Sequence, residues 1–161
     1  SQKHSSENSG LGTYDDMGRP PTSGNPGLNM QAELFGTNDV IVKYVLEGHD
    51  RGVSVTKFSP DGKWVLSGGQ DGRIKLWDLT AGKLLKELPA HDGPVTSVEF
   101  HPNELLVATG SADRTVKFWD LETFDLVDTA VEATGVRSML FTPEGDALLT
   151  GTSEFLKVWK W

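Results

Sequence analysis

The chain has 161 residues, a formal net charge of −8 and no cysteine. This length suffices for one domain with its own core, and the cysteine count excludes disulfides and thiolate chemistry. The acidic charge argues against sequence-independent binding to nucleic acid or anionic membranes. Since no apolar run is as long as a membrane span and the polar start shows no signal core, we predict a cytoplasmic location without membrane insertion.

Residues 1–38 differ in composition from the rest of the chain. They are rich in Ser, Gly, Pro and Asn, so ordering them would bury too little apolar area to offset the lost chain entropy. We predict a flexible N-terminal arm over 1–38, with Leu34 and Phe35 docked on the folded part, and a partial propeller over 39–161.

The segment "DVIVKYVLEGHDRG" (39–52) opens the folded part. Its alternating apolar residues predict a β-strand over 40–46. A strand needs a neighbour for its backbone N–H and C=O groups, and residues 1–38 do not look able to supply one. We therefore expect this strand to pair with a distant part of the chain or with another chain.

An internal repeat dominates the sequence from residue 49 onward. "GHDRGVSVTKFSPDGKWVLSGGQDGRIKLWDL" aligns without a gap with "AHDGPVTSVEFHPNELLVATGSADRTVKFWDL", and a weaker third copy, "EATGVRSMLFTPEGDALLTGTSEFLKVWKW", follows. A period in the low forties with G-H and W-D pairs is typical of four-stranded propeller blades. We predict an all-β fold, a portion of a β-propeller with about three antiparallel blades over about 53–88, 95–129 and 136–160.

The repeats carry polar residues that resemble a hydrolase triad, but they recur at constant spacing. A catalytic set occurs once, so we assign no catalytic residue and predict that the protein is not an enzyme. The pattern resembles the WD-repeat family, in which such residues form a hydrogen-bonded chain inside each blade. The residues assigned to this blade network are His49, Ser67, Asp71, Trp77, His91, Thr109, Asp113, Trp119, Thr150 and Trp159.

The third copy departs from the pattern. Glu132 stands at the histidine position and Glu154 near the aspartate position, while Thr150 and Trp159 remain. We expect an incomplete polar chain there and the least stable blade. The four histidines lack metal-ligand spacing and no phosphate-binding loop is present, so no metal or cofactor is predicted.

In such propellers, the loops that carry the repeated His and Asp residues lie on one face. Charged loop residues on a rigid scaffold often serve recognition, so we predict protein contacts there; the alternative is that these charges are merely solvated. The candidate protein-contact face comprises Asp50, Arg51, Arg73, Asp92, Arg114 and Arg137.

Three blades are too few for a closed ring, since propellers typically have four to eight. The blades therefore belong to a larger propeller or assemble with another chain. In a two-fold homodimer, six blades would close the ring, and the 40–46 strand of each chain would complete the last blade of its partner.

Two family resemblances divide the chain near Val53 and Ser54. Residues 54–161, through "WDLTAGK", "FHPNE" and "SADRTVKFWDLE", resemble the regulatory, non-ATPase subunit of katanin, a microtubule-severing ATPase. Residues 32–53, "AELFGTNDVIVKYVLEGHDRGV", are similar to the alpha subunit of coatomer. Val55 is displaced by one position from its counterparts Val98 and Met139, so the apolar alternation breaks at the same place. We interpret this as a join between two WD-repeat sources.

These resemblances imply competing functions. The leading interpretation is a non-catalytic interaction scaffold of the katanin regulatory type, with the katanin catalytic subunit or microtubule-associated proteins as partners and a cytoskeletal association. The alternative is a coatomer-like vesicle coat module that binds dilysine sorting signals on cargo. A structural propeller element of a larger assembly is the third.

Overall fold

A computed structural model describes residues 40–161. The chain divides into two compact units, Ser1–Glu47 and Gly48–Trp161, which we describe separately. The predicted arm over 1–38 and the docking of Leu34 and Phe35 lie outside the described residues. In the first unit, the described residues 40–47 form neither helix nor strand.

The strand predicted over 40–46 is therefore absent from this structure of one chain. The alternation of Val40, Val42 and Tyr44 suits a strand, but a strand persists only when its backbone groups pair with a neighbour. None of the strands within residues 48–161 pairs with this segment. Apolar alternation indicates which face a strand would bury, and it says nothing about whether a partner is at hand.

The second unit consists of β-strands, and residues 48–161 contain no helix. The all-β class predicted from the repeat is confirmed. The strands are β1 (Val53–Phe58), β2 (Trp64–Gly69), β3 (Ile74–Asp78), β4 (Lys83–Leu88), β5 (Val95–Phe100), β6 (Leu106–Ser111), β7 (Thr115–Asp120), β8 (Leu126–Val131), β9 (Val136–Phe141), β10 (Ala147–Thr152) and β11 (Leu156–Lys160).

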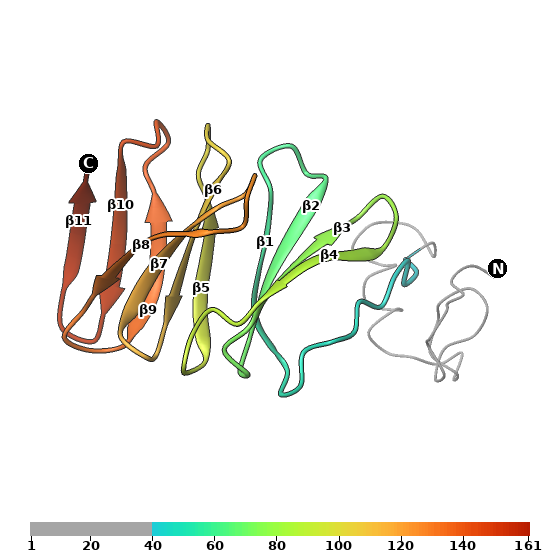
Figure 1. Cartoon of the computed structure of the whole chain (residues 1–161), viewed down its shortest axis with the longest axis horizontal. Helices are drawn as coiled ribbons and strands as arrows, with labels where there is room; N and C mark the ends of the chain where they lie inside the picture. The colour runs from blue at the N-terminus through green and yellow to red at the C-terminus, as the bar shows by residue number, and fades with distance from the viewer. Residues whose placement is uncertain (1–39) are drawn as a thin grey trace. The chain divides into compact units, whose positions relative to one another are not determined.

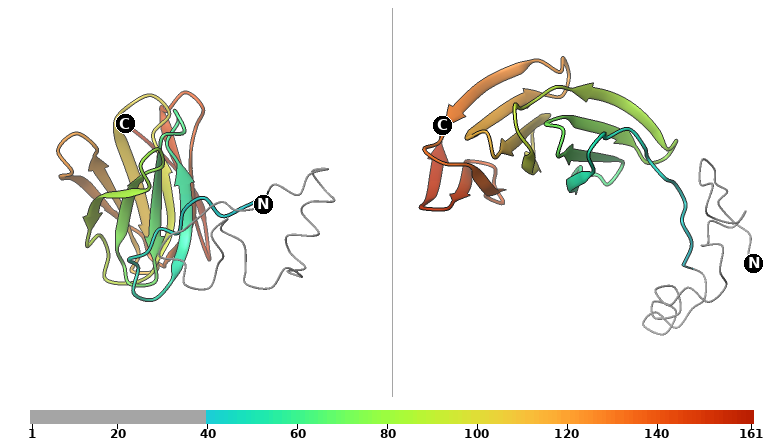
Figure 2. Two further views of the ribbon diagram at one scale, coloured as in Figure 1. Left: turned by 90° about the vertical axis from the view of Figure 1, so that its right-hand side faces the viewer. Right: turned by 90° about the horizontal axis from the view of Figure 1, so that it is seen from below.

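These strands form three antiparallel sheets, each paired in simple sequence order. Blade one is β1-β2-β3-β4, blade two is β5-β6-β7-β8, and blade three is the three-stranded sheet β9-β10-β11. The blades stand side by side in chain order and form an open array (Figures 1 and 2). Blade two ends at Val131, two residues beyond the expected boundary at 129.

Turn residues set the hairpins between the first two strands of blades one and three. In "SPDG", the Ser59 hydroxyl donates to Asp61 at 2.7 Å and Gly62 has a φ of 75°. Thr142, Asp146 and Gly145 repeat this arrangement in blade three. Such turns need a side chain that accepts local hydrogen bonds and a glycine that adopts positive φ.

The first strand of every blade contains a β-bulge after its first residue. The register shifts between Val53 and Val55 in β1 and between Val95 and Ser97 in β5. The shift in β9 lies opposite Gly151 and Thr152. Val55 is therefore the counterpart of Ser97, while Thr56 stands at the position of Val98 and Met139. Val55 packs against the core from its displaced position, and the bulge does not account for this difference because all copies share it.

The core lies between the blades. One cluster joins blades one and two, and a second joins blades two and three. In the first, Leu66 and Leu76 of blade one meet Val98 and Val107 of blade two. Trp64 is half-buried and packs against this cluster. Each blade thus buries apolar side chains against its neighbour, as expected for stacked sheets.

Candidate protein-contact face

One end of the blades brings together the loops that carry the repeated His and Asp residues. The connection between blades one and two is tied to the β2–β3 turn by the His91 N–H, which donates to the Gly72 carbonyl at 2.9 Å. The Glu132 N–H donates in the same way to the Arg114 carbonyl at 2.8 Å. These loops lie opposite the β1–β2, β5–β6 and β9–β10 hairpins (Figure 1), so they form one face.

Blade two holds a polar chain that runs from an indole to an aspartate. The Trp119 indole N–H donates to Thr109 Oγ1 at 3.0 Å, and Thr109 Oγ1 lies 2.8 Å from Nε2 of His91. His91 Nδ1 lies 3.1 Å from the Asp113 carboxylate and 2.9 Å from the Thr115 hydroxyl. A carboxylate only accepts, so Nδ1 carries the proton and Nε2 accepts from Thr109.

Burial decides the charge state of this chain. It lowers the pKa of His91, although the neighbouring Asp113 carboxylate partly offsets the effect. Burial also acts to raise the pKa of Asp113, but hydrogen bonds from the Thr115 hydroxyl and the Asp92 backbone N–H, together with His91, outweigh it and leave the pKa below its ordinary value. Near neutral pH, a neutral imidazole therefore donates to an ionised carboxylate.

Blade one repeats the chain with looser geometry. Trp77 Nε1 donates to Ser67 Oγ at 2.8 Å, and Ser67 Oγ lies 2.7 Å from His49 Nε2. His49 Nδ1, however, lies 3.4 Å from either Asp71 oxygen. Asp71 resists the effect of burial through hydrogen bonds from the backbone N–H groups of Arg73 and Asp50, and its pKa is lowered.

Blade three completes the hydrogen-bonded chain of side chains with a different acceptor, whereas the sequence analysis predicted an incomplete chain there. The Trp159 indole donates to Thr150 Oγ1 at 2.9 Å, and the Thr150 hydroxyl donates to Glu132 at 2.8 Å. Lys157 contacts the other Glu132 oxygen at 2.8 Å. Glu132 is only 3% exposed, so its carboxylate replaces the imidazole as acceptor and a lysine balances the charge. Glu154 is exposed and contributes its backbone N–H to Thr152.

A lysine recurs at an equivalent position in all three blades, and the sequence analysis assigned no role to it. Lys75, Lys117 and Lys157 lie opposite Ser67, Thr109 and Thr150 in the β2–β3, β6–β7 and β10–β11 pairs. Lys75 is buried and binds Glu87 at 2.8 Å, while Lys117 donates to the Ala90 carbonyl at 2.8 Å. The recurrence at every copy was visible in the sequence, although the different partners were not.

The acidic members of the candidate face are held in place by the blade chains. The backbone N–H of Asp50 donates to Asp71 at 3.1 Å, and that of Asp92 donates to Asp113 at 3.0 Å. Both side chains are exposed. The buried aspartates thus fix the loop backbone while the carboxylates of Asp50 and Asp92 face solvent at equivalent positions of two blades.

The arginines of the face are in different situations. Arg73 is half-buried and bound to Glu87 at 2.6 Å. Arg114 is exposed and occupies the left-handed region at a φ of 76°, which is unusual for a residue with a side chain. Arg51 and Arg137 are exposed. The face thus offers both signs of charge, with Arg73 already engaged.

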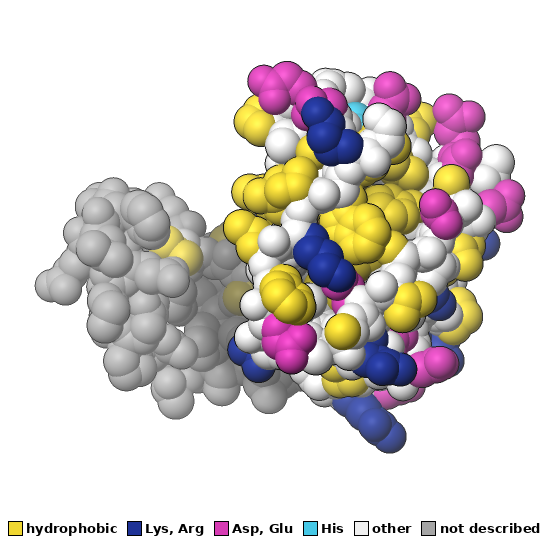
Figure 3. Space-filling view, turned by 90° about the vertical axis from the view of Figure 1, so that its left-hand side faces the viewer, with side chains coloured by type: hydrophobic (Ala, Val, Ile, Leu, Met, Phe, Trp, Pro, Cys, Tyr) yellow, Lys and Arg dark blue, Asp and Glu magenta, His cyan; other side chains and the backbone are white. Residues whose placement is uncertain are grey.

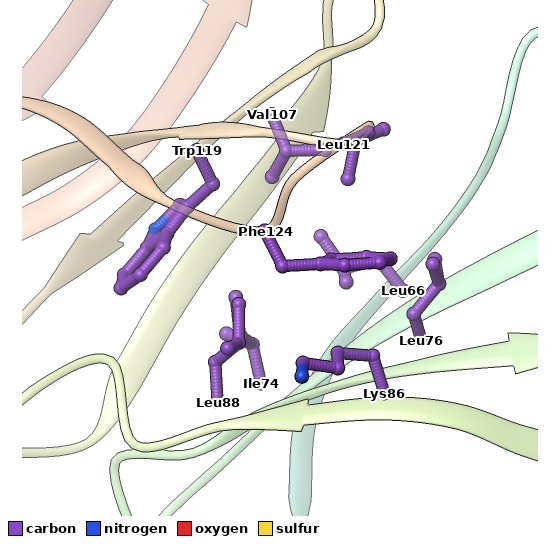
Figure 4. A pocket seen from close by; sticks show the side chains of 9 residues that line it. All are labelled: Leu66, Ile74, Leu76, Lys86, Leu88, Val107, Trp119, Leu121 and Phe124. Carbon is purple, nitrogen blue, oxygen red and sulfur yellow. The ribbon is translucent and has the colours of Figure 1, made fainter.

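Two further hollows lie away from this face. The first, between blades one and two, has a volume of only about 10 Å³, too small for a ligand. Phe124 from the β7–β8 turn lies among the side chains around it (Figure 4), at a φ of 63°. The second, of about 220 Å³, lies at the opposite end beside Trp64, His101 and Glu104.

His101 is a structural residue of this second hollow. Its Nε2 lies 2.8 Å from the Gly145 carbonyl, and its Nδ1 accepts from the backbone N–H groups of Asn103 and Glu104. Residues 40–161 contain no cluster of His, Asp or Glu suited to a metal ion. Within the same residues, no helix is long and apolar enough to cross a membrane.

Stacked antiparallel blades, two of four strands and one of three, with an indole–hydroxyl–acceptor chain in each define a propeller-type repeat protein. Residues 41–78 and 82–120 match the family described as WD domain, G-beta repeat. The chain therefore contains WD40 repeats, and its fold is an open portion of a WD40 propeller.

The comparison with characterised proteins adds two kinds of relative. The chain is 55% identical over 51 residues to the putative coatomer subunit alpha of Schizosaccharomyces pombe and 50% identical over 54 residues to coatomer subunit alpha-2 of Arabidopsis thaliana. These matches cover 32% and 34% of this chain but only 4% of each relative. Small ribosomal subunit protein RACK1y of Oryza sativa is 37% identical over 70 residues, 44% of this chain and 21% of the relative.

None of these three relatives is a katanin subunit. The katanin resemblance of residues 54–161, with the microtubule-linked partners and cytoskeletal association that it implies, stays a prediction. The join near Val53 and Ser54 stays a prediction as well.

Proposed function

We propose that this WD40 segment is a non-catalytic scaffold of a vesicle coat, active in the cytoplasm, and that its loop face binds lysine-bearing sorting signals at the C-terminus of cargo. The observation that carries the proposal is the identity of about half over a third of the chain to coatomer alpha subunits. This favours the coat interpretation over the katanin one. Because the chain spans about 4% of those relatives' length, the proposal concerns this face alone.

The charges of the face suit such a ligand. Asp50 and Asp92 are exposed carboxylates on loops that Asp71 and Asp113 hold rigid, so each can accept from a lysine ammonium group without ordering its own backbone. Arg51, beside Asp50, and Arg114, in the β6–β7 turn, are exposed cations on the same face and can take the terminal carboxylate of the peptide. A peptide with two lysines close to its C-terminus carries ammonium groups for the carboxylates of this face and a terminal carboxylate for its arginines.

Binding of a synthetic peptide with two lysines near a free C-terminus tests the proposal. Isothermal calorimetry at low salt should detect binding to the full chain, and a peptide with serines in place of the lysines should not bind. Asp50→Asn together with Asp92→Asn should weaken binding roughly two- to thirtyfold, because each exposed ion pair contributes about 0.2–1 kcal/mol. Affinity should fall further as salt is added.

The matched control is Glu122→Gln, which removes an exposed carboxylate from the β7–β8 turn at the other end of blade two. It should leave the affinity unchanged. Arg114→Glu should weaken binding of the free-acid peptide relative to that of a C-terminally amidated peptide. Equal affinity for the lysine and serine peptides would refute the proposal.

A further inference from the structure

The two complete junctions between blades share one contact. Val95, the first residue of blade two, lies against Gly68 of blade one, where a Cβ would come within 2.5 Å of the valine Cγ1. Val136, the first residue of blade three, lies against Gly110 of blade two, with 2.7 Å for the same pair of atoms. Each glycine thus leaves room for the valine of the next blade only because it has no side chain of its own. We call this glycine position the seat of the blade.

Blade three presents the same seat without an occupant among residues 48–161. Gly151 pairs with Leu156 as Gly68 pairs with Ile74 and Gly110 with Val116. A Cβ on Gly151 would meet only atoms of Ser138 in its own blade. Gly151 is therefore the third seat, on the face of blade three that points away from blade two, which we call the open face.

The side chains around this seat are apolar and exposed. Leu156 is 71% exposed, whereas its counterpart Ile74 is 2% exposed. Val158 is 61% exposed and lies beside Leu149, which in turn lies beside Leu140. Apolar side chains gather in the middle of this side of the molecule (Figure 3). A contiguous apolar patch of this kind marks an interaction surface.

Blade one carries the corresponding valine, Val53, at the other end of the array. Val53 is the counterpart of Val95 and Val136, yet it is 53% exposed where they are at most 1% exposed. Phe58, the counterpart of the buried Phe141, is also exposed. The array thus ends in a glycine seat on blade three and, at its other end, in an exposed valine of the kind that contacts such a seat.

The spacing along the chain adds a second, independent match. β4 completes blade one and ends at Leu88, seven residues before Val95, which seats on that same blade. Leu46 stands seven residues before Val53. A copy whose Val53 seats on Gly151 of another molecule therefore brings its residues 41–46 to the free edge of β11, where blade three lacks a fourth strand.

We propose that the open face of blade three binds blade one of a second copy of this chain, with Val53 seated on Gly151 and residues 41–46 added to β11. Two such contacts close a ring of six blades, within the range of four to eight found in propellers. The occupant is specified by this chain's own junctions, since the same valine–glycine contact recurs in both and the spacing between Leu46 and Val53 equals that between Leu88 and Val95.

Light scattering over a range of protein concentrations tests the proposal. The full chain should have twice the 17.5 kDa mass of one chain. Val158→Glu should reduce the mass to that of one chain, because a charge on the open face must be desolvated on association. Val127→Glu is the matched control, since Val127 is a valine of β8 with similar exposure, and this variant should remain a dimer.

Cysteine cross-linking tests the seat itself in a chain that has no cysteine of its own. The template Val95 Cβ lies 2.8 Å from a Cβ built on Gly68, about 1 Å closer than a relaxed disulfide requires, so a small shift allows the bond. An oxidised mixture of a Val53→Cys chain and a Gly151→Cys chain should give a covalent dimer of the two. A mixture of Val53→Cys with Val127→Cys should not.

Four results would overturn the proposal. The first is a single-chain mass at every concentration, which would leave the open face to another part of a longer polypeptide or to a different protein. The second is a mass that grows without limit as concentration rises, which would mean that the contact does not close. The others are a dimer that survives Val158→Glu and a failure of the Val53–Gly151 pair to cross-link. Circular dichroism of each variant separates loss of association from loss of folding.

Discussion

Blades two and three solve one structural problem with different chemistry. In both, an indole N–H donates to a buried threonine hydroxyl, which then donates onward. In blade two the acceptor is the neutral imidazole of His91, supported by Asp113. In blade three it is the carboxylate of Glu132, supported by Lys157.

The difference indicates what the blade requires from this position. The buried threonine hydroxyl needs an acceptor, because an unpaired buried hydroxyl costs about 1–3 kcal/mol. An imidazole and a carboxylate both meet that need, but each requires a second group: a carboxylate that fixes the imidazole tautomer, or a cation that offsets the buried charge. The histidine that recurs in blades one and two is thus one of several residues that can supply this acceptor.

Removal of Asp113 should have the largest effect. Asp113→Ala deletes an acceptor of the Asp92 and Thr115 backbone N–H groups, of the Thr115 hydroxyl and of His91. Bonds to a charged group are worth about 1.5–3 kcal/mol each, and water replaces some of them, so we expect a loss of about 3 kcal/mol in the free energy of unfolding. Asp71→Ala should cost less, since its contact with His49 is longer. Urea titration measures both, and equal stability of Asp113→Ala and the parent would contradict the assignment.

Glu132 tests whether blade three needs an acceptor or a charge. Glu132→Ala leaves the Thr150 hydroxyl without its acceptor and Lys157 without its counter-ion, so we expect a loss of about 2 kcal/mol. Glu132→Gln keeps an acceptor oxygen and should cost about half as much. Lys157→Met leaves the buried Glu132 carboxylate without its counter-ion, so it should cost about as much as Glu132→Ala. A Gln variant as unstable as the Ala variant would show that charge dominates.

Acid should weaken blade two. Burial lowers the pKa of His91 in the folded chain, so the unfolded chain binds this proton more readily. The stabilisation is fully present above the unfolded value of about 6.5 and is lost as pH falls below it through the folded pKa. Relative to its intrinsic rate, amide exchange in β5 to β8 should rise as pH falls below about 6.5, and His91→Gln should remove that dependence. An unchanged pH profile in the variant would assign the effect elsewhere.

The repeat predicted much of this fold because its period is a property of sequence alone. Identical spacing of His, Asp and Trp in two copies is enough to predict four-stranded blades and their turns. The segment 40–46 shows the limit. Its pattern is that of a strand, but strand formation depends on an edge that the local sequence does not encode, and residues 40–46 form no strand in this structure.

The site was predictable where residues recur and not where they are replaced. The polar residues around His49 and His91 were predicted from the repeat, whereas Glu132 was interpreted as a break in the polar chain of blade three. Its role depends on Lys157, which reaches it from β11, and such a contact becomes visible only in three dimensions. The bulge that places Val55 opposite blade two was hidden for the same reason, since a shift of register leaves no mark in the letters.

Ser97 offers the smallest and most local comparison between the two blades. Its hydroxyl in β5 is buried and, among the described residues, is the one buried side-chain polar atom without a partner. Ser138 is the counterpart in β9 and is exposed. Ser97→Ala removes a desolvated hydroxyl and should raise the free energy of unfolding by about 0.5–1 kcal/mol, while Ser138→Ala should change it by less than about 0.5 kcal/mol. Thermal unfolding of the two variants measures the difference, and a destabilised Ser97→Ala would mean that the hydroxyl holds a buried water.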